Sequence, residues 1–145
     1  PPHAVLVDEC PSWWGFCRQD ERREPTFDEA QWPGYKQRHV AWWKVPVLHE
    51  IIKAGKVDWV MWMDSDAAII DQSIDLRWVI ALAPEGTRMI VSQDIWPTNG
   101  EGQCNTGVFL VKADSQGLEL LEAWWQAADE TKELQAFRGS HPWEQ

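Results

Sequence analysis

Apolar side chains recur along much of the chain at intervals that are typical of amphipathic helices. Residues 40–55 carry them three and four positions apart, so we expect a helix in which Pro46 either introduces a kink or lies in the first turn. A shorter helix is predicted over 73–84, with Ser73 as a candidate N-cap. A long helix is predicted over 115–137, with an apolar side formed by Leu118, Leu121, Trp124 and Trp125.

Shorter apolar runs between these helices predict strands. Residues 57–63 are almost continuously apolar, which is the pattern of a strand covered on both faces. Further strands are predicted over 3–9, 87–94 and 105–113. Residues 10–39 are rich in charge, proline and glycine without a clear period, so they are predicted to be mainly loop. The alternation of strands with helices predicts an α/β sandwich with a mostly parallel sheet.

Acidic residues follow several of these predicted strands. Asp8 ends the first strand, Asp64 and Asp66 follow the run at 57–63, and Asp94 ends another strand. In open parallel sheets, ligands bind beyond the carboxyl ends of the strands, so we expect these acids to lie near one site. The chain contains neither the glycine-rich dinucleotide fingerprint nor a P-loop.

Length and charge limit the classes of function. The chain has 145 residues, which predicts a single domain over 1–145 with one hydrophobic core. Its formal net charge of −10 argues against binding to nucleic acid or charge-driven docking on an anionic membrane. An acidic site that holds a diphosphate needs a cation to mediate the contact. The 12 tryptophans are expected mainly in packing, although their flat faces also suit sugar rings.

The cysteines and the chain ends say little about location. Cys10, Cys17 and Cys104 fit no zinc template. Cys10 and Cys17 could close a small loop in an oxidising compartment, and three free thiols in a reducing one are equally consistent. No apolar run has the length of a membrane span, and no signal-peptide pattern opens the chain. The chain lacks an initiator Met and ends abruptly, so we expect a partial domain.

The pair Asp64 and Asp66 stands directly after the most apolar stretch of the chain. An Asp-x-Asp has little specificity by itself, and an acidic turn with solvated side chains is the simple alternative. Carboxylates at the end of a buried strand are unfavourable, however, unless a cation or a donor pairs with them. Two of them one residue apart offer hard oxygen ligands that suit Mg²⁺ or Mn²⁺ and leave positions for phosphate oxygens. This context predicts a divalent metal site.

The chain resembles the galactosyltransferase/xylosyltransferase family of glycosyltransferases in five segments that occur in the same order. These are AWWKVPVLHEII, WVMWMDSDAAII, VSQD, NTGVFLVKADSQGLELLEAWW and PWEQ, and they cover roughly residues 36–145. The strongest elements are the blocks around DSDA and NTGVFLV. The resemblance implies a GT-A fold, a three-layer α/β/α sandwich with a mostly parallel central sheet. A nucleotide-diphospho-sugar would lie over that sheet, with a divalent metal held by the Asp-x-Asp.

The resemblance also implies roles for individual residues. Asp64 and Asp66 would coordinate Mn²⁺ or Mg²⁺ bridging the donor diphosphate, and Ser65 would approach the nucleotide ribose. Other residues that match substrate-binding positions are Lys44, Gln93, Asn105, Thr106 and Gly107. Those that match positions near the reacting sugar, as candidate catalytic groups, are Asp94, Glu144 and Gln145. A third metal ligand, a histidine in related enzymes, would lie beyond this chain. The chain's own histidines, His3, His39, His49 and His141, are expected at the surface or in the core.

The predicted activity is transfer of a hexosyl or pentosyl unit from a nucleotide sugar, UDP-linked, to a glycan hydroxyl, with retention at the anomeric carbon. Two routes to retention stay open. One is double displacement with Glu144 or Asp94 as the nucleophile, and the other is front-face attack with Gln145 steadying the sugar. The partners would be the nucleotide-sugar donor and a glycan acceptor. The resemblance further implies the Golgi lumen and a type II membrane protein, although this chain contains no anchor.

Two other functions remain as alternatives. One is a non-catalytic carbohydrate-binding module, a remnant of the transferase fold. The other is a metal-dependent phosphatase of the haloacid-dehalogenase type, which also carries an Asp-x-Asp after a strand. That type expects the pair near the first strand, whereas DSDAAIID stands in the middle of this chain, so the phosphatase is the less favoured alternative.

Overall fold

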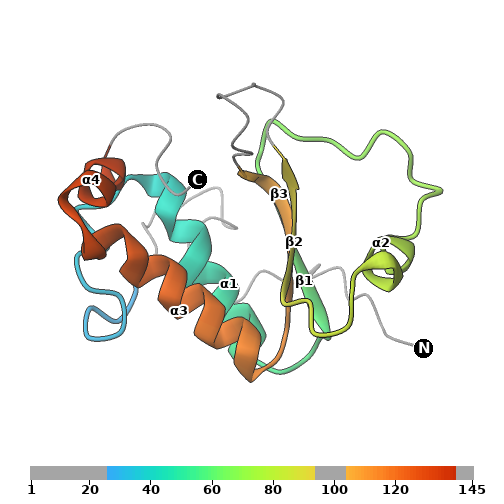
Figure 1. The fold of residues 1–145 in the computed structure, drawn as a ribbon, viewed down its shortest axis with the longest axis horizontal. Helices are drawn as coiled ribbons and strands as arrows, with labels where there is room; N and C mark the ends of the chain where they lie inside the picture. Colours follow the sequence, from blue (N-terminus) through green and yellow to red (C-terminus); the bar gives the residue numbers. More distant parts are fainter. Residues whose placement is uncertain (1–25, 94–103, 140–145) are drawn as a thin grey trace, which may run out of the picture.

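The protein is described here by a computed structural model, which covers residues 26–93 and 104–139. In chain order the elements are η1 (Val40–Trp43), α1 (Lys44–Lys53), β1 (Trp59–Met63), α2 (Leu76–Leu82), β2 (Met89–Gln93), β3 (Cys104–Lys112), α3 (Ser115–Glu130), α4 (Lys132–Gln135) and η2 (Ala136–Arg138). The strand predicted over 3–9 lies outside the described residues. Helices α1 and α3 lie side by side and cover one face of the sheet, while α2 lies on the other side (Figure 1).

The described sheet corrects the expectation of a mostly parallel one. Its order is β1-β3-β2, and β3 is antiparallel to both neighbours. Only residues 94–103 separate β2 from β3, whereas parallel neighbours need a crossover of about a dozen residues or more. Strands β1 and β2 run in the same direction, with β3 between them. The described residues are therefore α/β in class with a small antiparallel sheet, and they do not form a full sandwich around a mostly parallel sheet.

The core lies between the sheet and the two long helices. Leu121 and Trp125 of α3 are almost completely buried in it, together with Leu48 of α1, so the predicted apolar side of the long helix is confirmed. Antiparallel pairing places every second side chain of each strand on this face. Two cross-strand rows face the helices: Val60, Val111 and Met89, and Trp62, Phe109 and Val91.

Strand β1 confirms the strand predicted over 57–63, although it is less covered than expected. Trp59 and Trp62 are both partly buried. Trp62 packs against the core, and Trp59 and Met61 alternate with it toward the other face. A strand covered on both faces would bury all of these side chains. The near-continuous apolar run thus belongs to a half-buried strand in the described part of the chain.

The start of α1 settles where Pro46 lies. The predicted helix begins as the 3-10 turn η1, whose N-cap His39 accepts a hydrogen bond at Nδ1 from the backbone N–H of Ala41 (3.2 Å). The α-helix then begins at Lys44, so Pro46 occupies its first turn. A backbone N–H in the first turn has no intrahelical acceptor, and proline loses nothing there. The first-turn alternative is therefore confirmed.

Two helix boundaries differ from those predicted. Asp75, and not Ser73, is the N-cap of α2, because Asp75 accepts from the N–H of Arg77 (2.9 Å) while Ser73 is bound to Asp71. The helix predicted over 115–137 is divided at Thr131, which has extended backbone. Its hydroxyl accepts from the N–H of Leu134 (3.2 Å) and so begins α4. Threonine favours such caps over helix interiors because its hydroxyl competes for backbone hydrogen bonds.

Arg38 joins the segment before η1 to the end of α3. Its buried guanidinium stacks over the rings of Trp42 and Trp125 and donates to the carbonyl of Trp125 (2.8 Å) and to Asp129 (3.1 Å). Burial lowers the pKa of Arg38 to about 10, while Asp129 acts in the opposite direction. The group therefore remains charged at neutral pH, and its counter-charge, Asp129, lies exposed at the edge of the core. This contact keeps the aromatic rings of two distant segments together.

Gly117 provides a direct test of how α3 is packed against β3. A Cβ at this position would lie 1.9 Å from the carbonyl oxygen of Lys112, a backbone atom that cannot swing away. We expect Gly117→Ala to lower the free energy of unfolding by about 2 kcal/mol or more. Gly139→Ala is the control, because a Cβ added there would meet no atom within 4 Å. Urea denaturation measures both variants, and equal stability would contradict this packing.

Candidate functional site

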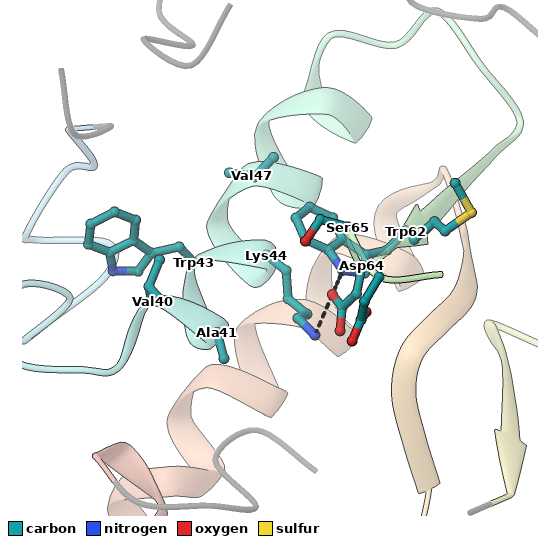
Figure 2. A pocket seen from close by; sticks show the side chains of 10 residues that line it. Val40, Ala41, Trp43, Lys44, Val47, Trp62, Asp64 and Ser65 are labelled. Carbon is teal, nitrogen blue, oxygen red and sulfur yellow. Dashed lines mark hydrogen bonds and ion pairs between the residues drawn. The ribbon is translucent and has the colours of Figure 1, made fainter. Parts of the chain in front are cut away.

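A pocket of about 610 Å³ opens between the start of α1 and the end of β1 (Figure 2). It is lined from η1 and α1 by Val40, Ala41, Trp43, Lys44 and Val47. It is lined from β1 and the following turn by Trp62, Met63, Asp64, Ser65 and Asp66. The acid pair that the sequence singled out therefore lies in a pocket, and Lys44 and Ser65 lie there with it.

An ion pair between the buried Lys44 and the partly exposed Asp64 lines this pocket. The Lys44 side chain is 3% exposed, and its Nζ is 3.3 Å from Oδ1 of Asp64. The same ammonium donates to the carbonyl oxygen of Thr106 (3.1 Å) and lies 5.7 Å from the ring centre of Trp62. An ammonium removed from water needs such partners. Asp64 is thus the counter-charge of a buried cation as well as a pocket residue.

Asp64 is held from two further directions. Its Oδ1 accepts a hydrogen bond from the indole Nε1 of Trp62 (2.5 Å). Its backbone N–H donates to the carbonyl of Gly107 (2.8 Å), which continues the β1–β3 ladder one step past the pair Met63–Val108. Side chain and backbone are both fixed, so the direction of this carboxylate is set before any ligand arrives.

An irregularity in β3 brings the segment Asn105–Gly107 to the site. Val91 of β2 pairs with Phe109, but the next residue, Ser92, pairs with Asn105, so the residues between those two partners have no partner on β2. They keep the β1 register instead, because the carbonyl of Gly107 bonds to Asp64. Such bulges re-aim parts of a strand. Here the bulge lets main-chain carbonyls face Lys44 and Asp64.

Gly107 lies close to two polar side chains. Its N–H donates to Oδ1 of Asn105 (2.9 Å). A Cβ on Gly107 would lie 3.0 Å from that oxygen and 3.5 Å from Oδ2 of Asp64. Gly107 therefore lies close to the site's own side chains, while its substrate-binding role stays a prediction.

The remaining predicted residues are placed in different ways. Ser65 and Asp66 are exposed at the pocket, and Gln93 is exposed at the end of β2, where it pairs with Cys104 and does not line this pocket. Cys104 is a free, exposed thiol. The residues that lie outside the described part of the chain are Asp94, Glu144 and Gln145, and also His3, Asp8, Cys10, Cys17 and His141. Their predicted roles stay predictions.

His49 lies in the core, as expected for a histidine without a ligand role. It is buried in α1, with Nε2 3.1 Å from Oε1 of Glu122 and 3.3 Å from Nε2 of Gln31. Its ring stands edge to face with Trp32, with centres 5.0 Å apart. His39 caps η1. Both described histidines are therefore structural in their contacts.

Sequence reasoning missed two contributions to the site. Trp62 was expected only to pack, yet its indole N–H bonds Asp64. The spacing of two residues in a strand, which places both side chains on one face, was the available signal. The apolar side of the pocket, with Val40 and Trp43, was also not singled out. Its signal was the helical spacing that places Val40 one turn before Lys44.

The donor set suits a cation that is shared with a diphosphate. Oδ1 of Asp64 is engaged by Lys44 and Trp62, which leaves Oδ2, and Asp66 is exposed. Within residues 26–93 and 104–139, no group of three or more His, Cys, Asp or Glu side chains could hold a metal ion. Mg²⁺ is commonly bound by one or two carboxylates together with substrate phosphates and water. The residues therefore fit such a shared site and do not form a closed metal centre by themselves.

The ion pair predicts different stabilities for two variants of the acid pair. Asp64→Asn removes the negative charge that lies 3.3 Å from the buried ammonium of Lys44. We expect a loss of about 1–2 kcal/mol in the free energy of unfolding, less than for a fully buried pair because Asp64 keeps 38% of its side chain exposed. Asp66→Asn, at an exposed position, is the matched control and should change little. Urea denaturation without divalent metal measures both, and equal losses would contradict the assignment.

Comparisons with known proteins place this chain beside plant glycosyltransferases. No family model and no solved structure matches it. It is 34% identical over 92 residues to Probable glycosyltransferase 3 of Oryza sativa, and 30% identical over 89 residues to Xyloglucan 6-xylosyltransferase 1 of Arabidopsis thaliana. Each match covers 57% of this chain but only 18% of the relative, so the chain spans less than a fifth of these relatives.

No helix among the described residues is long and apolar enough to cross a membrane.

The two matches carry names that agree with the motifs in the sequence. Over the matched stretch the chain is a relative of proteins named as glycosyltransferases and xylosyltransferases, which confirms its resemblance to the galactosyltransferase/xylosyltransferase family.

Proposed function

We propose that the protein acts as a glycosyltransferase that moves a hexosyl or pentosyl unit from a nucleotide-diphospho-sugar to a glycan hydroxyl. The observation that carries this proposal is the acid pair in the pocket, where Asp64 is held by a buried lysine and a tryptophan. The names of the relatives agree with this reaction class and favour it over a phosphatase. In this proposal Asp64 and Asp66 hold Mn²⁺ or Mg²⁺ against the donor diphosphate.

The chain's own residues contribute orientation and charge. Asp64 is fixed by Lys44, Trp62 and the ladder to Gly107. The side chain therefore loses little conformational entropy when its Oδ2 binds a ligand. When bound, the metal ion neutralises negative charge that develops on the departing diphosphate. The ammonium of Lys44 adds positive charge immediately behind Asp64. The same proposal includes a contact between Lys44 and the nucleotide-sugar donor. It also includes catalytic roles for Asp94, Glu144 and Gln145 and retention at the anomeric carbon.

The described residues are proposed to be part of a larger GT-A domain. Strands β1 and β2 run in the same direction and are joined through α2, as in one unit of a parallel α/β sheet. A relative named Xyloglucan 6-xylosyltransferase 1 favours a pentosyl unit, xylosyl, as the group transferred, and UDP as the carrier remains part of the proposal. A place in the Golgi lumen, by a type II membrane anchor outside this chain, completes the proposal.

Binding of UDP to the 145-residue chain tests this function. We expect calorimetric titration to show UDP binding with Mn²⁺ and at least about tenfold weaker binding without it. Asp64→Ala and Asp66→Ala should each reduce binding by about 100-fold, because two carboxylates are the proposed protein ligands. Asp58→Ala is the matched control, since Asp58 is exposed just before β1 and does not line the pocket.

Other outcomes point to the alternatives. A folded chain that binds a glycan but no UDP with Mn²⁺ would favour the non-catalytic carbohydrate-binding module. Hydrolysis of a simple phosphate ester that is lost in Asp64→Ala would favour the phosphatase. Loss of UDP binding in Asp58→Ala to the same degree as in Asp64→Ala would contradict the assigned site.

A further inference from the structure

The pocket has two chemically different ends. The β1 side carries the polar side chains of Asp64, Ser65 and Asp66 next to Trp62 and Met63, and the η1 and α1 side is apolar apart from Lys44. Figure 2 shows Val40 and Trp43 on one side of Lys44, with Asp64 and Ser65 on the other. A volume of about 610 Å³ lies within the range of roughly 300–1,000 Å³ that is usual for small-molecule sites. A ligand that fills it must therefore be polar at one end and apolar at the other.

The aromatic ring at the apolar end is fixed in place. Trp43 is partly exposed, and its indole Nε1 donates to the carbonyl oxygen of Tyr35 (3.2 Å). Its ring also packs edge to face against Phe27, with ring centres 6.3 Å apart. The only polar atom of the side chain is thus already used. A ring ordered in this way loses little conformational entropy when a ligand stacks on it.

The neighbours of Trp43 in the pocket favour a nucleobase over a sugar. Val40, Ala41 and Val47 carry no hydrogen-bonding groups in their side chains, and Val40 is 54% exposed. A sugar ring has hydroxyls around most of its edge, which would need partners here, whereas a pyrimidine base keeps its hydrogen-bonding groups on one side and can turn its apolar C5–C6 edge to these side chains. A nucleobase has two apolar π-faces and stacks on aromatic side chains. In a nucleoside diphosphate the ribose lies between the base and the phosphates, as Lys44 lies between Trp43 and Asp64 in Figure 2.

We propose that Trp43 and Val40 form the subsite for the nucleobase of the donor. This inference rests on the proposed function, because it places the diphosphate at Asp64 and Asp66. It makes Trp43 a residue that determines affinity for the nucleoside part of the ligand. The base lies at the η1 end of the pocket, the ribose passes Lys44, and the diphosphate reaches the acid pair.

The experiment compares two ligands that differ by the nucleoside. Calorimetry with Mn²⁺ measures UDP and inorganic pyrophosphate on the 145-residue chain and on Trp43→Leu, Trp43→Phe and Trp78→Leu. We expect Trp43→Leu to weaken UDP about tenfold, because stacking on an aromatic ring is lost. Pyrophosphate binding should stay within about twofold, which also reports that the site is folded. Trp43→Phe should restore most of the UDP affinity, and Trp78→Leu, on exposed α2, should change neither ligand.

Several outcomes would overturn the inference. Equal losses of UDP and pyrophosphate in Trp43→Leu would mean that Trp43 only supports the fold. Unchanged UDP binding in Trp43→Leu, with both ligands lost in Asp64→Ala, would place the base elsewhere and leave the proposed function standing. A loss seen with a UDP-sugar but not with UDP would assign the ring to a sugar. Failure of the unaltered chain to bind either ligand would remove the proposed function and this inference together.

Discussion

The buried ammonium of Lys44 is the interaction on which the pocket depends. The side chain starts in the first turn of α1, and its head group bonds the carboxylate of Asp64 after β1 and the carbonyl of Thr106 in β3. A charge removed from water costs several kcal/mol unless its partners stay in place. The start of a helix and the ends of two strands are therefore held together by one cation. The acids of the pocket are oriented by the same contact that stabilises their surroundings.

The strand arrangement explains how a short segment supplies so much of the site. An antiparallel β3 begins where β1 and β2 end, so Asn105 and Gly107 lie beside Asp64 and not at the far edge of the sheet. The register shift between Val91 and Ser92 then leaves residues 106–108 without a partner on β2, while Asn105 still pairs with Ser92. The carbonyls of this segment bond Lys44 and the backbone of Asp64, so this part of β3 holds two pocket residues in place without lining the pocket itself.

Local signals in the sequence predicted the elements, whereas contacts between distant residues were beyond them. Hydrophobic periodicity located both long helices and three strands, and the position of Asp64 after an apolar run predicted a polar site. Strand order was missed because periodicity reports which face is buried, not which strand is the partner. The N-cap at Asp75 was missed because Ser73 and Asp75 are both suitable caps in the sequence. Ser73 is bound to Asp71, so Asp75 caps the helix. The bond from Lys44 to Thr106 joins residues too far apart in sequence for any pattern to show.

The register shift in β3 has a consequence for how such a protein can diversify. The pairing of β1 with β3 continues without a shift up to Asp64, because the irregularity in register lies only between β2 and β3. A change of register between β2 and β3 would therefore leave the ladder bond that holds Asp64 in place. The β2 side of β3 can therefore change its pairing while the β1 side keeps the contacts of Asp64. The irregular stretch of β3 between Asn105 and Phe109 separates the variable side from the constant one.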